Sequence, residues 1–118
     1  MSARIVKKNG GKVTIEIDLD LKGSMLSQEQ AIQLVVNEAG KLATQSALEG
    51  FDTGGEPIVV KGQQLTSKGR KKVITTPFGP LQLERHMYQP SRGGKTYCPL
   101  DYGARLLVKS TPRLAKLL

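Results

Sequence analysis

The chain has 118 residues, of which 38% are hydrophobic and 24% are charged, and Lys and Arg outnumber Asp and Glu by 18 to 10. This size fits one domain with a single modest core, and the composition argues against a disordered chain. One cysteine excludes an intramolecular disulfide and a cysteine-based zinc site within one chain. With no apolar run long enough for a signal peptide or a membrane span, we expect a cytoplasmic protein with no membrane partner.

The first half predicts one strand and one long helix. Apolar and polar residues alternate strictly from Lys12 to Leu21, which is typical of a half-buried strand over residues 12–21. Ser27 and Gln30 have the spacing of a capping box, and apolar residues follow at helical spacing as far as Gly50. We therefore predict a helix over residues 27–49.

The second half predicts strands joined by tight turns. A turn-rich cluster precedes a β-prone run at 57–61, and Pro77-Phe78-Gly79-Pro80 separates two further runs, at 71–77 and 80–88, as in a β-hairpin. On its second strand one face would carry Leu81, Leu83, Arg85 and Met87. Residues 96–98 can form one more short strand. Thr111 and Pro112 favour the start of a short helix that reaches Leu118.

Together these elements predict an α+β fold for residues 1–118 as a single domain. Its core would be one small, mainly antiparallel sheet of the strands 12–21, 57–61, 71–77 and 80–88. The helix 27–49 would pack across this sheet, and a short helix would end the chain.

The positive charge is concentrated in the middle of the chain. Residues 1–60 hold six basic and eight acidic side chains, whereas residues 61–95 hold eight basic and one acidic. Clustered cations can release counterions from a nucleic acid, while an evenly spread excess would serve only solubility. Aromatic residues are few, so stacking on single strands has little support, and we expect duplex DNA as the partner.

No motif predicts catalysis or a cofactor. Gly93-Gly94-Lys95-Thr96 resembles the end of a phosphate-binding loop, but Gln89 stands where that motif needs glycine, and Tyr97-Cys98-Pro99 forbids the helix that must follow. His86 is the only histidine, so a pair of histidine ligands cannot form. Cys98 has no oxyanion-loop signature beside it, and we expect a packed thiol. Alternate acids from Glu16 to Asp20 are better explained as a solvated strand face than as metal ligands.

The remaining candidates for a site are basic. We expect phosphate contacts from four side chains of one run, Lys68, Arg70, Lys71 and Lys72. Candidate groove contacts come from the second strand of the hairpin and the loop after it, namely Arg85, His86, Arg92 and Lys95.

The second half also resembles a known family, the bacterial insertion-sequence transposases of the ISKra type. The resemblance spans roughly residues 63–118 and no comparable match precedes it. It rests on Thr75-Thr76-Pro77-Phe78-Gly79-Pro80, Glu84-Arg85-His86-Met87-Tyr88-Gln89, Gly93-Gly94-Lys95-Thr96-Tyr97-Cys98-Pro99-Leu100, Ala104-Arg105, and Ser110-Thr111-Pro112-Arg113-Leu114-Ala115-Lys116.

The resemblance implies a region that precedes the catalytic domain of a transposase and recognises transposon ends or helps assembly on them. We expect no enzyme activity, because the family's catalytic domain is absent from the chain. A truncated remnant, a regulatory fragment and a piece cut by design all fit the early stop. The alternative function is a protein interaction module without DNA affinity. It would form a homodimer or dock on a full-length transposase, with Leu114, Leu117 and Leu118 as the expected contacts.

Overall fold

The computed structural model describes residues 2–90, 96–106 and 110–117. Its fold is α+β, as predicted, but the strands form two small antiparallel sheets where one was expected. The chain divides into two compact units, Met1–Ser46 and Ala47–Leu118. Within the described residues, no helix is both long and apolar enough to span a membrane.

The first unit holds a hairpin and most of the long helix. Strands β1 (Ser2–Asn9) and β2 (Lys12–Asp18) pair around a turn at Gly10 and Gly11, and Gly10 has a positive φ of 60°. Such a φ suits a two-residue hairpin turn and is readily adopted by glycine. The predicted strand 12–21 therefore pairs with β1, which the sequence analysis missed, and belongs to a sheet of its own.

Helix α1 (Met25–Glu49) confirms the predicted helix but begins two residues earlier. The backbone N–H of Ser27 donates to the Ser24 hydroxyl over 3.2 Å, so Ser24 is the residue that caps the helix. In the first unit this helix buries Ala31 and Val35. The apolar side chains Ile5 and Ile15 of the hairpin are half-buried.

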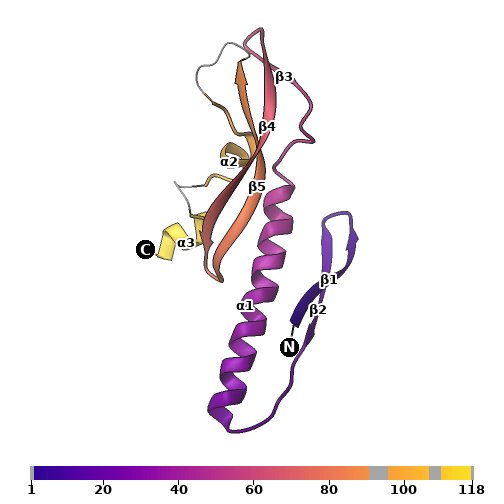
Figure 1. Ribbon diagram of the computed structural model, residues 1–118, viewed down its shortest axis with the longest axis vertical. Coiled ribbons are helices and arrows are strands. Elements are labelled where there is room, and N and C mark those ends of the chain that lie inside the picture. Colours follow the sequence, from indigo (N-terminus) through magenta and orange to yellow (C-terminus); the bar gives the residue numbers. More distant parts are fainter. Residues whose placement is uncertain (1, 91–95, 107–109, 118) are drawn as a thin grey trace. The chain divides into compact units, whose positions relative to one another are not determined.

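The second unit is built on a three-stranded sheet in the order β3 (Ile58–Val60), β4 (Gln63–Thr76) and β5 (Gly79–Pro90). Strands β4 and β5 form a long twisted ribbon (Figure 1) around the predicted turn at Pro77 and Phe78. Of the short strand expected at residues 96–98, only Tyr97 pairs, through a bridge to Tyr88. Helices α2 (Pro99–Gly103) and α3 (Pro112–Leu117) follow, and α3 matches the predicted C-terminal helix.

The core of the second unit covers one face of the ribbon near its turn. Leu100 of α2 is fully buried there and clusters with residues of α1, β4, β5 and the stretch before α2, namely Leu48, Ile74, Leu81, Leu83 and Cys98. The predicted shared face of Leu81, Leu83 and Arg85 is thus confirmed by their burial. Cys98 is a packed thiol, as expected, and its burial raises its pKa above the ordinary value.

Candidate nucleic-acid interface

One face of the β4–β5 ribbon changes from apolar to cationic along its length. The antiparallel register places Ile74 opposite Leu81, Lys72 opposite Leu83, and Arg70 opposite Arg85. Because side chains alternate between the two sides of a strand, Lys68, Arg70 and Lys72 of β4 share the face that carries Arg85 of β5. We call Lys68, Arg70, Lys72 and Arg85 the cationic face.

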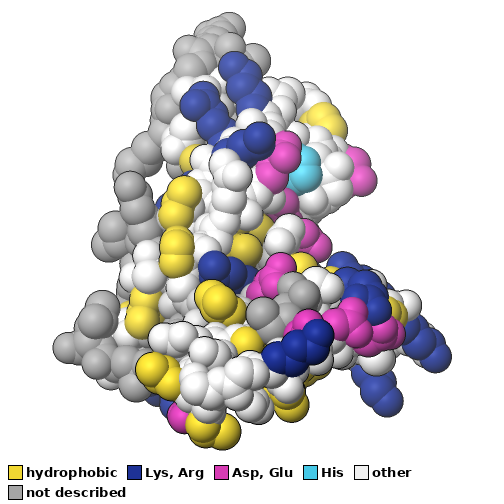
Figure 2. Space-filling view, turned by 60° about the horizontal axis from the view of Figure 1, so that its bottom comes forward, with side chains coloured by type: hydrophobic (Ala, Val, Ile, Leu, Met, Phe, Trp, Pro, Cys, Tyr) yellow, Lys and Arg dark blue, Asp and Glu magenta, His cyan; other side chains and the backbone are white. Residues whose placement is uncertain are grey.

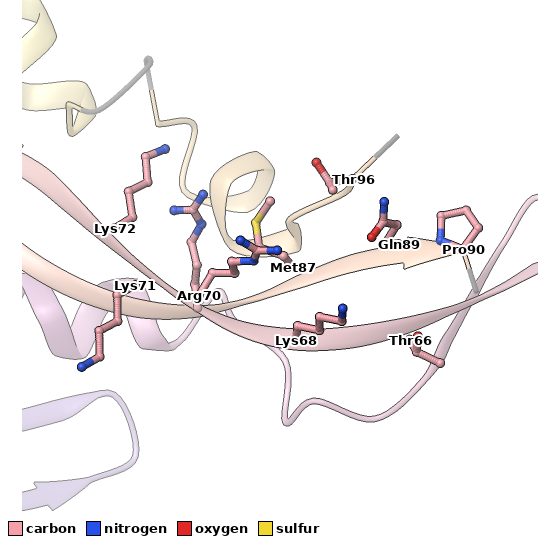
Figure 3. A pocket seen from close by; sticks show the side chains of 10 residues that line it. Thr66, Lys68, Arg70, Lys71, Lys72, Met87, Gln89, Pro90 and Thr96 are labelled. Carbon is pink, nitrogen blue, oxygen red and sulfur yellow. The ribbon is translucent and has the colours of Figure 1, made fainter. Parts of the chain in front are cut away.

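A cavity of about 450 Å³ lies on this face, a volume within the usual range of ligand sites, about 300–1,000 Å³. It is bordered by the four cations and by Thr66, Lys71, Met87, Gln89, Pro90 and Thr96 (Figure 3). None of these described lining residues is acidic. The cavity can therefore attract an anion and offer it hydroxyl and amide groups as well as charge.

Exposure of the cations falls toward the core. Lys68 and Arg70 are exposed, the Lys72 side chain retains 18% of its accessible surface, and that of Arg85 retains 9%. The outer two can meet a large partner directly. The inner two are held in place by their neighbours and belong to the floor of the site.

Asp101, in the first turn of α2, holds the two inner cations. Its Oδ1 lies 3.1 Å from Arg85 Nε and its Oδ2 lies 3.4 Å from Lys72 Nζ. Arg85 Nε–H also donates to Cys98 Sγ over 3.2 Å. One carboxylate thus faces two cations. The positive charge of this part of the face is only partly neutralised.

The opposite face of the ribbon carries Lys71 and Glu84, and around His86 and Tyr88 it is covered by the segment that follows α1, residues 52–56. His86 Nδ1 lies 3.0 Å from Asp52 Oδ2, and the His86 backbone N–H donates to the other carboxylate oxygen over 3.3 Å. Figure 2 shows the histidine beside acidic side chains. The fully buried Tyr88 hydroxyl donates to the carbonyl of Glu56 over 2.8 Å and shares a 2.6 Å hydrogen bond with the Thr53 hydroxyl.

Close packing fixes this covering segment. A Cβ at Gly55, where φ is 91°, would lie 3.0 Å from His86 Nε2, so only glycine fits without displacement. Asp52, Gly55 and His86 therefore form a structural contact between the segment and the sheet.

The structure brings together Lys68, Arg70, Lys72 and Arg85 of the predicted site. Lys71 also borders the cavity, but its side chain leaves β4 on the side opposite to Lys72 (Figure 3). His86 lies on the opposite face from Arg85. Arg92 and Lys95 lie outside the described residues, as does Leu118, one of the leucines expected to mediate self-association.

The sequence analysis missed Asp101 and the polar lining residues Thr66, Gln89 and Thr96. Alternation along β4 could have indicated Thr66, because it lies two residues from Lys68 on the same face. Asp101 carried no local signal, since its pairing with β5 depends on where α2 packs.

Comparison with family models, curated proteins and solved structures finds no match to this chain. The resemblance to ISKra-type transposases therefore remains a prediction from the quoted motifs. Among the described residues, no group of three or more His, Cys, Asp or Glu side chains is placed to hold a metal ion.

Proposed function

We propose that the chain binds duplex DNA without catalysing a reaction on it, and that the cationic face makes the contact. The observation that carries the proposal is the gathering of four cations on one side of a two-stranded ribbon, around a cavity with no acidic lining residue in the described part of the chain. Cations on a common surface gain affinity by displacing counterions from DNA phosphates.

The spacing of the cations suits a regular polyanion. Lys68, Arg70 and Lys72 succeed one another at every second position of β4, which separates them by about 6.8 Å along an antiparallel strand. Neighbouring phosphates of one DNA strand rise by roughly 3.4 Å along the helix axis and also turn about it, so the distance between them is longer than this rise and is comparable with the spacing of the side chains. A two-stranded ribbon is also narrow enough to lie in a major groove. These side chains can therefore contact neighbouring phosphates of one strand.

Transposon ends are the DNA sites that the resemblance implies, and a cytoplasmic location belongs to the same proposal. The proposal assigns no contact to Lys71 or His86, because their side chains lie on the other side of the ribbon. It also involves no metal-dependent strand cleavage.

The test compares two double variants that remove equal charge. Lys68→Gln with Arg70→Gln changes the cationic face, whereas Lys7→Gln with Lys12→Gln removes two exposed cations outside it. Fluorescence anisotropy with end-labelled duplexes, of inverted-repeat and scrambled sequence, gives the dissociation constants. We expect the first variant to weaken binding to both duplexes by about tenfold or more, because two charged contacts are lost.

The second variant should bind like the wild-type chain. Equal losses in the two variants would mean that net charge alone drives the binding and would refute the assignment to the cationic face. Absence of duplex binding by a wild-type chain that self-associates in light scattering would instead favour the protein interaction module.

A further inference from the structure

We infer that the cavity on the cationic face is a discrete site for one phosphate group, seated between Arg70 and Arg85. DNA is the proposed source of this phosphate, so the inference rests on the proposed function. It goes further by distinguishing one structured anion site from a diffuse attraction of surface charges.

The first support is an unpartnered charged group. Arg85 is more than nine-tenths buried, and its Nη1 has no hydrogen-bond partner among the described residues, whereas its Nε faces Asp101 and Cys98. A buried charged donor without an acceptor is costly, so such atoms are rare in folded proteins. Arg85 borders the cavity, and a small shift of its guanidinium group would bring the enclosed Nη1 within reach of an oxyanion bound there.

The second support is the pairing of two arginines. Arg70 and Arg85 are direct partners across β4 and β5. Like charges at directly opposed positions repel each other, and no ion pair of Arg70 is found within the described residues. A tetrahedral anion with several acceptor oxygens can bind both guanidinium groups at once and remove this repulsion.

The third support is the balance of charge around the cavity. The Asp101 carboxylate pairs with Arg85 and Lys72. It does not neutralise the charges of Arg70 and Lys68. Hydroxyl groups of Thr66 and Thr96 also border the cavity and can donate to oxyanion oxygens. The arrangement suits a phosphate better than a carboxylate, because a phosphate offers more acceptors to several donors.

The test titrates inorganic phosphate into the full chain at constant ionic strength, held with chloride. Binding is followed by the NMR signals of the arginine Nε–H groups and by calorimetry. We expect saturable binding to the wild-type chain, with a signal change at Arg85. Arg70→Gln should raise the dissociation constant by about tenfold, since a charged hydrogen bond is lost. Lys12→Gln, which removes an exposed cation of the first unit, should leave it unchanged.

Two further measurements separate the possible failures. Competition between phosphate and a duplex, measured by anisotropy, tests whether DNA uses this site. A duplex that binds while inorganic phosphate does not would overturn the inference and leave the proposed function standing. Phosphate binding that depends on Arg70, without any duplex binding, would overturn the proposed function alone.

Duplexes with different 5′ ends show which phosphate of the DNA occupies the site. Tighter binding of a 5′-phosphorylated duplex than of a 5′-hydroxyl duplex would identify a terminal phosphate, and equal binding would identify an internal phosphodiester. Both results support a phosphate site. Phosphate binding of equal strength in the wild-type, Arg70→Gln and Lys12→Gln chains would place the anion elsewhere and overturn the inference.

Discussion

Arg70 and Arg85 lie directly opposite each other on β4 and β5, with their side chains on one face of the ribbon. Opposed like charges weaken a sheet by about 0.2–1 kcal/mol, and a stable scaffold gains nothing from them. Positions that cost stability are often retained for binding. This pair therefore links the stability of the ribbon to its proposed function.

Removing one arginine should stabilise the free protein. We expect Arg70→Gln to raise the free energy of unfolding by about 0.5 kcal/mol in urea denaturation while it weakens duplex binding. Lys71→Gln is the matched control, because Lys71 stands opposite Glu84, a residue of opposite charge. Its unfolding free energy should fall by a few tenths of a kcal/mol. A lower stability of Arg70→Gln would contradict the view that Arg70 serves binding.

Asp101 should be the most important carboxylate of the second unit. Its replacement by Asn removes the charge that faces both Arg85 and Lys72, and it leaves a buried guanidinium uncompensated. We expect Asp101→Asn to lower the unfolding free energy by about 3 kcal/mol. Asp20→Asn, at an exposed pair with Lys22, is the control and should cost less than about 0.5 kcal/mol. Similar losses in both variants would argue against a structural role for Asp101.

The Tyr88 hydroxyl should hold the covering segment without affecting DNA. Tyr88→Phe removes its hydrogen bonds to Thr53 and to the Glu56 carbonyl, which should cost about 1–2 kcal/mol of unfolding free energy. Duplex affinity should stay unchanged, because these contacts lie on the face opposite to the cations. Tyr102→Phe, at a residue 74% exposed, should leave stability within about 0.5 kcal/mol of wild type. A large loss of duplex affinity in Tyr88→Phe would show that the two faces are not independent.

Acid should weaken the first hairpin through Asp18. The Arg4 guanidinium donates a hydrogen bond to Asp18 over 2.6 Å and holds the pKa of this carboxyl below its ordinary value. A depressed pKa in the folded state stabilises the hairpin above the unfolded pKa of about 4, and this contribution is lost as the pH falls through the folded pKa. In a carboxyl NMR titration, Arg4→Gln should raise the pKa of Asp18. Lys12→Gln should not. An unchanged pKa in Arg4→Gln would contradict the pairing.

Local pattern was sufficient for α1 and for the β4–β5 hairpin. The helical spacing up to Gly50 and the Pro77–Pro80 turn predicted both elements. Strand β1 was missed because a bulge between Ile5 and Lys7 interrupts its alternation of apolar and polar residues, although the Gly10-Gly11 turn was a usable signal. Without β1, the predicted strand at residues 12–21 had no partner of its own. The prediction therefore placed it with the strands of the second unit and joined two sheets into one.

Long-range contacts explain what the sequence could not indicate at the site. Strand β4 begins at Gln63, well before the predicted residue 71, because pairing with β3 and β5 overrides the low strand propensity of its cationic run. The position of Asp101 depends on how α2 packs, and the separation of Lys71 from its neighbours depends on the register. Composition indicated the charge, whereas the pairing of strands determined which charges share a face.

The salt dependence of duplex binding tests the central claim most directly. The dissociation constant of the wild-type chain for a short duplex is measured at several salt concentrations, with the log of the association constant plotted against the log of the salt concentration. Each neutralised phosphate contributes roughly −0.9 to the slope, so the cationic face predicts a slope between about −2 and −4. A slope near zero, or no binding at low salt, would contradict the proposal that this chain binds DNA through its cationic face.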